Sequence, residues 1–192
     1  MDFADIIRKN RSYRRFHENQ PIHGEIMREL VNYARFSASS GNMQGLKFYL
    51  STDPDKNSLI FSTVSWAYYL KDWDGPETGE RPSAYVIILG DTGIYKTIDV
   101  DVGIAAQSIL LGAVSLGYGG CMIGSLDRVS LRKKLDIPDR YEIPLLIALG
   151  KPAESIVTEP LGANGSIEYW RDEQQVHHVP KRSLEELIIY SF

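Results

Sequence analysis

The longest apolar pattern in the chain runs through residues 99–117 and predicts a buried helix. Its small and apolar side chains recur at the i, i+3, i+4 and i+7 spacing of one helix face. These positions are Val102, Ala105, Ala106, Ile109, Leu110, Ala113 and Gly117. The opposite face is almost as apolar, so we expect neighbours on all sides of this helix. Asp99 and Asp101 are placed to accept free backbone N–H groups at its start, and Gly117 is placed to end it.

Patterns on both sides of this segment predict further helices and strands. Helical spacing is found at residues 2–9, 22–37 and 130–135, the last capped by Ser130, and more weakly at residues 59–64. Apolar runs without polar alternation predict strands covered on both faces at residues 84–90, 119–123 and 144–150. An aromatic-rich strand is expected at residues 46–52.

Residues 66–82 are harder to interpret, because they are first aromatic and then rich in turn residues. Trp66, Tyr69 and Trp73 fit two roles equally well. They are either packing residues of a core or the walls of a cleft.

The composition of the chain changes after Gly150. Residues 151–182 contain Pro, Gly, Asn and charged residues but few long apolar runs, and an irregular stretch of that length is unusual inside a compact domain. We therefore expect it to lie on another surface, most simply that of a second subunit. Ser183 and Glu186 have the spacing of a capping box, which predicts a short terminal helix. The side chains expected to face inward from this helix are Leu184, Leu187 and Ile188.

Composition narrows the class of protein. A chain of 192 residues is long enough for one domain with a substantial core. A net charge of −4 argues against broad nucleic-acid binding, which needs a basic excess. The apolar run in residues 99–117 is shorter than the roughly 20 residues of a membrane span and contains Gln107 and Ser108, so no membrane association is expected. The single Cys121 excludes an internal disulfide, and the first ten residues lack a signal pattern, so we expect a cytoplasmic protein.

A basic cluster follows the first predicted helix. Arg11, Ser12, Arg14 and Arg15 bring several guanidinium groups and a hydroxyl together, and guanidinium forks match phosphate oxygens. A solvated basic turn is the equally weighted alternative. Lys181 and Arg182, close to the end of the chain, either add to such a phosphate site or lie exposed.

A polar loop precedes the strand expected at residues 46–52. It contains Ser39, Ser40, Asn42 and Gln44. Amide side chains carry both donors and acceptors, so this loop is suited to bind the edge of a planar heteroaromatic ring. Ordinary turn chemistry explains the same composition.

A glycine-rich turn follows the central helix at residues 117–124. Its glycines allow the backbone to approach a flat ligand closely. A tight turn between helix and strand is the alternative, and the spacing is not that of the dinucleotide-binding fingerprint. We expect an apolar setting to leave Cys121 unreactive. His177 and His178 have no evident metal partners and are expected at the surface or at an interface.

Taken together, these segments resemble the nitroreductase-like flavoproteins in order and spacing, over nearly the whole chain. The matching segments are RSYRRF, SSGNMQGLKF, DVDVGIAAQSILLGAVSLGYGGCMIG, ALGKPAE and PKRSLEEL. The resemblance implies an α+β protein with a three-layer α/β/α fold and a central mixed, mostly antiparallel sheet. It further implies an intertwined homodimer with one FMN at each end of the interface. Residues 1–192 would form one domain, with residues 151–192 as an extension embracing the partner subunit.

The resemblance also assigns FMN contacts to residues of this chain. The family's phosphate-binding pattern falls on Arg11, Ser12 and Arg14, with Lys181 and Arg182 as a C-terminal basic contribution. Its loop at the isoalloxazine edge falls on Ser39, Ser40, Asn42 and Gln44. Its ring-facing turn falls on Cys121, Met122, Ile123 and Gly124, where a backbone N–H is expected to face flavin N5. Lys47 and Arg11 are candidates to stabilise negative charge on the reduced ring.

Three departures from the family pattern affect these expectations. Asn10 stands where the family often has a second arginine, and Gly45 and Leu46 replace its Pro-Trp pair. The segment that often builds a substrate lid is short. The substrate class therefore stays open.

The resemblance implies an NAD(P)H-dependent FMN oxidoreductase that reduces nitroaromatic, quinone or related small acceptors by a ping-pong mechanism. The flavin performs the redox chemistry, so no protein acid or base is required for hydride uptake. Two alternatives remain: a flavoenzyme of the same fold with other chemistry, such as dehydrogenation, dehalogenation or flavin fragmentation, and a flavin-binding protein without enzymatic activity. The physiological acceptor and the preference between NADH and NADPH are not readable from the sequence.

Overall fold

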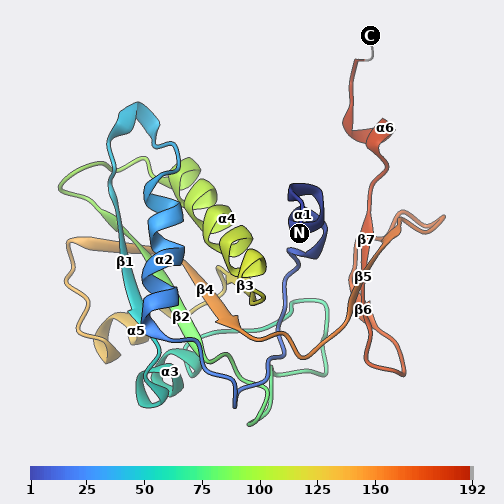
Figure 1. Cartoon of the computed structure of the whole chain (residues 1–192), viewed down its shortest axis with the longest axis horizontal. Coiled ribbons are helices and arrows are strands. Elements are labelled where there is room, and N and C mark those ends of the chain that lie inside the picture. The colour runs from blue at the N-terminus through green and yellow to red at the C-terminus, as the bar shows by residue number, and fades with distance from the viewer. Residues whose placement is uncertain (191–192) are drawn as a thin grey trace.

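The computed structural model describes residues 1–190 and has a body built on a four-stranded antiparallel sheet of order β1-β2-β4-β3 (Figure 1). The strands are β1 (Leu46–Ser51), β2 (Ala84–Asp91), β3 (Gly119–Ile123) and β4 (Tyr141–Gly150). The central strand β2 is buried along its whole length, because helices cover both faces of the sheet.

Alternate residues of the central strands point to two separate cores. Val86, Ile88 and Ile147 face α2 (Gly24–Arg35) and α4 (Asp99–Ser115). Tyr85, Ile87 and Leu146 face α3 (Pro54–Phe61) and α5 (Arg128–Lys134) on the other side. The predicted α+β class and the three layers are therefore confirmed.

The structure corrects details of two predicted helices. Helix α5 begins at Arg128, not at Ser130, because the Asp127 side chain accepts a hydrogen bond from the Ser130 backbone and caps the helix. Helix α4 has no side-chain cap, and Asp101 is used elsewhere. Gly117, with φ of 81°, follows the end of α4 as expected.

The burial predicted all around α4 is only partly right. Buried residues line the side that packs on the sheet and on α2. A stripe on the other side contains Val100, Gly103 and Gln107, which are exposed, and Ile104 and Leu111, which are half-buried. Helix α1 (Phe3–Lys9) contacts α4 but leaves Phe3 exposed. No helix within residues 1–190 is long and apolar enough to cross a membrane.

The chain after β4 is not the irregular stretch that its composition predicted. It forms a second, three-stranded sheet of order β5-β7-β6, from β5 (Ile156–Pro160), β6 (Trp170–Arg171) and β7 (His177–Lys181). Strands β5 and β7 pair in parallel, and β6 pairs with β7 in antiparallel orientation. Figure 1 shows this sheet standing apart from the body. Ladder hydrogen bonds satisfy its backbone without a large apolar core.

The terminal helix α6 (Leu184–Leu187) starts at the predicted capping box. The Ser183 side chain accepts the Glu186 backbone N–H, and the Glu186 side chain accepts the Ser183 backbone N–H. The prediction that its apolar residues face inward is wrong within the described chain, because Leu184 and Leu187 are 64% and 65% exposed and Ile188 is 49% exposed.

Candidate functional site

The basic cluster at residues 11–15, which we call the basic segment, lies beside the outer edge of β3. Ser12 forms a parallel bridge with Gly120, and the Tyr13 backbone N–H donates to the Gly120 carbonyl at 3.0 Å. A Cβ on Gly119 would lie 2.5 Å from the Tyr13 ring, so this close approach requires glycine. The result is that the arginines after α1 lie beside residues 121–124, which are the end of β3 and the residue after it rather than the predicted turn.

Three of the predicted phosphate-binding residues line one pocket of about 230 Å³ together with Lys181 from β7. The complete lining is Asn10, Arg11, Ser12, Arg14, Tyr169, His177, Val179 and Lys181. We call this the basic pocket. It contains cations and a hydroxyl but no carboxylate, the donor set that a phosphate group requires.

Two neighbouring arginines lie outside the basic pocket. Arg15 donates two hydrogen bonds of 2.6 Å to Glu80, which raises the pKa of Arg15 and lowers that of Glu80. Arg182 pairs with Glu186 at 3.2 Å and lines a separate hollow next to Lys181.

His177 contacts Arg14 inside the basic pocket and is buried, so the surface position expected for it is wrong. Its Nε2 lies 3.3 Å from Arg14 Nη1, and the Arg14 guanidinium packs over the Tyr169 ring at 4.7 Å. Burial first, and then the charges of Arg14 and Arg171, lower the pKa of His177 to about 4. At pH 7 the His177 imidazole is therefore neutral and accepts a hydrogen bond from Arg14. Because it carries no positive charge, it does not attract an anion away from Arg14.

Glu154 anchors the basic segment, and no local pattern singles this residue out beyond its place in ALGKPAE. Its side chain is 1% exposed and accepts the backbone N–H groups of Arg14 and Arg15. It also pairs with Arg171 of β6 at 3.0 Å. Burial lowers the pKa of Arg171, whose guanidinium packs on the Trp73 ring at 4.3 Å. One buried carboxylate thus joins the backbone of the basic segment to the second sheet.

The turn predicted to face a ring lines a second hollow of about 160 Å³, which shares Arg14 and Tyr169 with the basic pocket. We call it the turn pocket. The residues contributed by the turn are Cys121, Met122, Ile123 and Gly124. Gly119 and Gly120 do not leave room for a ligand, because Tyr13, Leu110 and the Ala148 carbonyl occupy the space that a Cβ would need. Gly124 alone of these glycines faces open space.

Both roles considered for the aromatic segment are found. Trp66 is buried against Phe61 and Trp73, and it also lines the turn pocket next to Tyr68, which is exposed. Burial raises the pKa of Cys121, in agreement with the expected unreactive thiol.

The polar loop at residues 39–44, which we call the amide loop, lies in a different part of the structure from the basic pocket and the turn pocket. Ser39, Gln44 and Lys47 line a groove between α2, β1 and α4, and none of residues 39–44 lines the basic pocket or the turn pocket within the described structure. In Figure 1 the connection between α2 and β1 lies far from β7. Asn42 and Gln44 both have positive φ, close to 54°, which gives this loop a fixed and unusual shape.

Asp101 holds the amide loop in place. The carboxylate is buried and accepts the Ser39 hydroxyl at 2.6 Å and the Ser40 backbone N–H at 2.9 Å. The sequence suggested a helix cap for this residue because an aspartate in a first turn commonly has that role. The long-range contact was not visible in the local pattern.

This combination defines the class of protein: a three-layer α+β fold with a cationic pocket and an adjoining glycine turn at the edge of its sheet. The family model described as "Nitroreductase family" matches residues 7–151. The chain therefore belongs to the nitroreductase family, and it is an oxidoreductase.

Named relatives share about a quarter of their residues with this chain. YodC of Bacillus subtilis (strain 168), whose name assigns it provisionally to the NAD(P)H nitroreductases, is 25% identical over 77% of this chain and 88% of its own length. An "NADPH-dependent oxidoreductase" of Staphylococcus aureus (strain MRSA252) is 26% identical over 78% of this chain and 64% of its own length. A "CR(VI) reductase" of Pseudomonas sp. (strain G-1) is 26% identical over 79% of this chain and 68% of its own length.

Solved structures agree on the fold. A nitroreductase family protein from Streptococcus pneumoniae TIGR4 has a TM-score of 0.70 at 17% identity, covering 87% of this chain and 99% of the other. An FMN-dependent nitroreductase from Clostridium difficile R20291 has a TM-score of 0.65 at 20% identity, covering 80% of this chain and 89% of the other.

Proposed function

We propose that this protein binds FMN and uses NAD(P)H to reduce small electron acceptors such as nitroaromatics and quinones. Family membership and the NAD(P)H-dependent names of two relatives support this reaction class. The observation that carries the FMN assignment is the basic pocket, where Arg11, Ser12, Arg14 and Lys181 meet beside the turn pocket. A cationic pocket next to one with aromatic walls fits a planar ring with a phosphorylated tail.

In this proposal the residues of the chain bind and position FMN, and none of them reacts itself. Arg14 and Lys181 supply positive charge for the phosphate, and Glu154 fixes the backbone that carries Arg14. The turn from Cys121 to Gly124 offers an exposed backbone to one face of the ring, and Trp66 closes the turn pocket on its core side. When bound, FMN supplies the hydride chemistry that allows the nicotinamide and the acceptor to react in turn.

The complete site requires two copies of the chain in this proposal. The amide loop and Lys47, which are suited to the polar edge of the ring, lie on a different part of the subunit from the basic pocket. Exposed apolar residues provide the surface for a partner, including Phe3 on α1, Val100 on α4 and Leu187 on α6. A homodimer that buries these residues would bring the amide loop of one copy to the basic pocket of the other, and residues 151–190 would lie against the partner.

Cofactor binding is tested with reconstituted protein and matched variants. Arg14→Met and Lys181→Met should each weaken FMN binding by about 10- to 100-fold, the cost of losing one charged hydrogen bond. Lys133→Met, an exposed lysine on α5, is the matched control and should bind FMN normally. A protein that stays colourless after reconstitution with FMN would refute the proposal.

The reaction and the shared site are tested separately. Either NADH or NADPH should bleach the bound flavin without oxygen, and yellow protein that neither nucleotide bleaches would refute the oxidoreductase step while leaving flavin binding intact. Co-expression of an Arg14→Met chain with a Ser39→Ala, Gln44→Ala chain should give mixed dimers with one intact site. Full loss of FMN from those dimers would show that both groups of residues serve the same subunit's site.

A further inference from the structure

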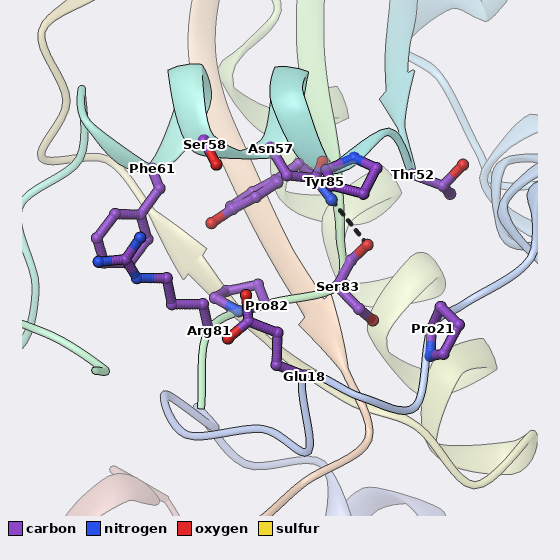
Figure 2. A pocket seen from close by; sticks show the side chains of 11 residues that line it. Glu18, Pro21, Thr52, Asn57, Ser58, Phe61, Arg81, Pro82, Ser83 and Tyr85 are labelled. Atoms are coloured by element: carbon purple, nitrogen blue, oxygen red, sulfur yellow. Dashed lines mark hydrogen bonds between the residues drawn. The ribbon is translucent and has the colours of Figure 1, made fainter. Parts of the chain in front are cut away.

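A third pocket lies on the α3 side of the sheet and shares no lining residue with the basic pocket or the turn pocket. Its walls come from the loop after the basic segment, one face of α3 along its whole length and the residues that lead into β2 (Figure 2). It has a volume of about 160 Å³, close to the ~150 Å³ of a cavity that holds benzene. We call it the α3 pocket.

Three polar atoms at the α3 pocket have no hydrogen-bond partner among the described residues. They are the Tyr85 hydroxyl, the Ser83 hydroxyl and Arg81 Nε, and each is closed off from bulk solvent. Tyr85 is 1% exposed and Ser83 is 7% exposed. Buried polar groups are normally satisfied by protein, water or ligand, and these three belong to residues that line one cavity. The present packing closes the three atoms to a water-sized molecule, so an occupant reaches them only after a side-chain shift.

The Asn57 side chain at the α3 pocket is satisfied. Asn57 accepts the Ser51 hydroxyl at 2.7 Å and donates to the Ser83 carbonyl at 2.8 Å, the bond drawn in Figure 2. Figure 2 shows the Tyr85 hydroxyl pointing away from this bond, toward the side where Phe61 and Arg81 lie. The Tyr85 hydroxyl and Arg81 therefore lie on the Phe61 side of the pocket, whereas Ser83 lies beside Asn57 (Figure 2).

Two opposite charges line the α3 pocket without pairing. Arg81 makes no hydrogen bond or ion pair with any residue of the range 1–190, and its guanidinium packs over the Phe61 ring at 4.3 Å. The Glu18 carboxylate lines the same pocket and accepts the Gly79 backbone N–H. Arg81 is a long side chain without a polar partner, so a shift that admits an occupant breaks no bond.

We propose that the α3 pocket binds a small zwitterion, namely a free α-amino acid with a short branched apolar side chain. Its carboxylate would accept from Arg81 and Tyr85, and its ammonium group would donate to Glu18. Its side chain would lie against Phe61 and Pro54. This occupant neutralises both unpaired charges and gives partners to Arg81 and Tyr85, two of the three orphan donors, whereas a simple carboxylate leaves Glu18 facing an anion.

Calorimetric titration of the full-length protein, loaded with FMN, tests the proposal with three probes of similar shape. L-Valine has both charged groups, isovalerate lacks the ammonium group and isobutylamine lacks the carboxylate. L-Valine should bind about tenfold or more tightly than either analogue, because each analogue loses one charged hydrogen bond. Equal binding of isovalerate, or no heat from L-valine at millimolar concentrations, would overturn the assignment, the latter indicating that the pocket holds only water.

Variants locate the binding. Arg81→Met and Glu18→Gln should each weaken L-valine binding about tenfold or more. Tyr85→Phe removes only the orphan hydroxyl, so it should fold normally and still lose affinity. Arg28→Met and Glu25→Gln, both exposed on α2, are the matched charge controls and should bind L-valine as the unchanged protein does. Binding that is unaffected by Tyr85→Phe and Arg81→Met would place the ligand elsewhere and refute the proposal.

Discussion

The body and the second sheet of this protein are stabilised by different forces. In the body, β2 and β4 pair at the centre of the sheet, and Val86, Ile87 and Ile147 are fully buried between helical layers. The second sheet has no such core. It is held by the Glu154–Arg171 pair and by His178, which bridges Glu159 at 3.0 Å and Asp172 at 3.2 Å.

This difference matters because the two regions jointly build the basic pocket. The body contributes Arg11 and Arg14, and the second sheet contributes His177 and Lys181. Apolar burial gives the body a stability that varies little with pH. Charged contacts make the second sheet sensitive to pH and to single substitutions. Cofactor binding should therefore be lost under milder conditions than those that unfold the body.

The largest expected loss of stability comes from a substitution that opens a cavity in the core of the body. Ile147→Ala should reduce the free energy of unfolding by about 2–5 kcal/mol, because Ile147 is fully buried in the sheet. Ile189→Ala, at a position that is 87% exposed beyond α6, should change it by less than about 0.5 kcal/mol in dilute protein. Denaturant unfolding measures both. Similar losses at the two positions would contradict the contrast between the regions.

The next effect concerns the junction between the regions. Glu154→Gln keeps the shape of the side chain but removes the charge that pairs with buried Arg171. We expect a loss of about 1.5–3 kcal/mol, the range for a charged hydrogen bond. Limited proteolysis should show cleavage after residue 150 while the body stays intact. Glu185→Gln, an exposed glutamate in α6, serves as control. Unfolding of the body together with the second sheet would show that the two are one cooperative unit.

Smaller, pH-dependent effects of opposite sign are expected from the two neighbouring histidines. The pKa of His177 falls from 6.5 to about 4 on folding, mainly through burial, so its contribution is complete above pH 6.5 and is lost as the pH falls toward 4. Hydrogen bonds to Glu159 and Asp172 raise the pKa of His178, so its contribution is complete below pH 6.5 and is lost as the pH rises through the raised value.

Proteolysis of the second sheet over a series of pH values should therefore show greatest resistance close to and just above pH 6.5. His177→Asn should remove the loss on the acid side, and His178→Asn the loss on the alkaline side. A resistance profile that is unchanged in both variants would exclude these histidines as its cause.

The smallest effect is expected at Cys121. Burial raises the pKa of this thiol, so iodoacetamide should alkylate it far more slowly in the folded protein than in the unfolded chain. Cys121→Ser should leave FMN binding almost unchanged, because only the backbone of the turn is proposed to face the ring. Rapid alkylation of the folded protein would show that the turn opens in solution.

Local patterns were sufficient for most helices and strands of the body. The period-3.6 spacing in α2 and α4 and the uninterrupted apolar runs in β2 and β4 report burial directly, since a helix or strand covered on one or both faces must be apolar there. The capping box of α6 was predicted for the same reason, because its two hydrogen bonds join residues three positions apart.

Composition did not predict the strands of the second sheet or their pairing. Strands β5 and β7 pair in parallel across some twenty residues of sequence, and no local signal specifies such a partner. Asp101 likewise looks like a helix cap in the sequence, but in the structure its carboxylate binds the loop at Ser39 and Ser40.

The sequence by itself determined most helices and strands of the body and the residue types of the basic segment, because helix and strand periodicity and guanidinium chemistry are properties of short stretches. The three-layer arrangement came from the resemblance to a family, not from these local patterns. Only the tertiary structure decided that Lys181 and His177 join Arg14, that Glu154 binds both the Arg14 backbone and Arg171, and that Tyr85 and Arg81 line one cavity while each has an atom without a partner. These relations depend on chain segments that are distant in sequence and meet only after folding, when buried charges and hydroxyl groups must find partners wherever the packing places them.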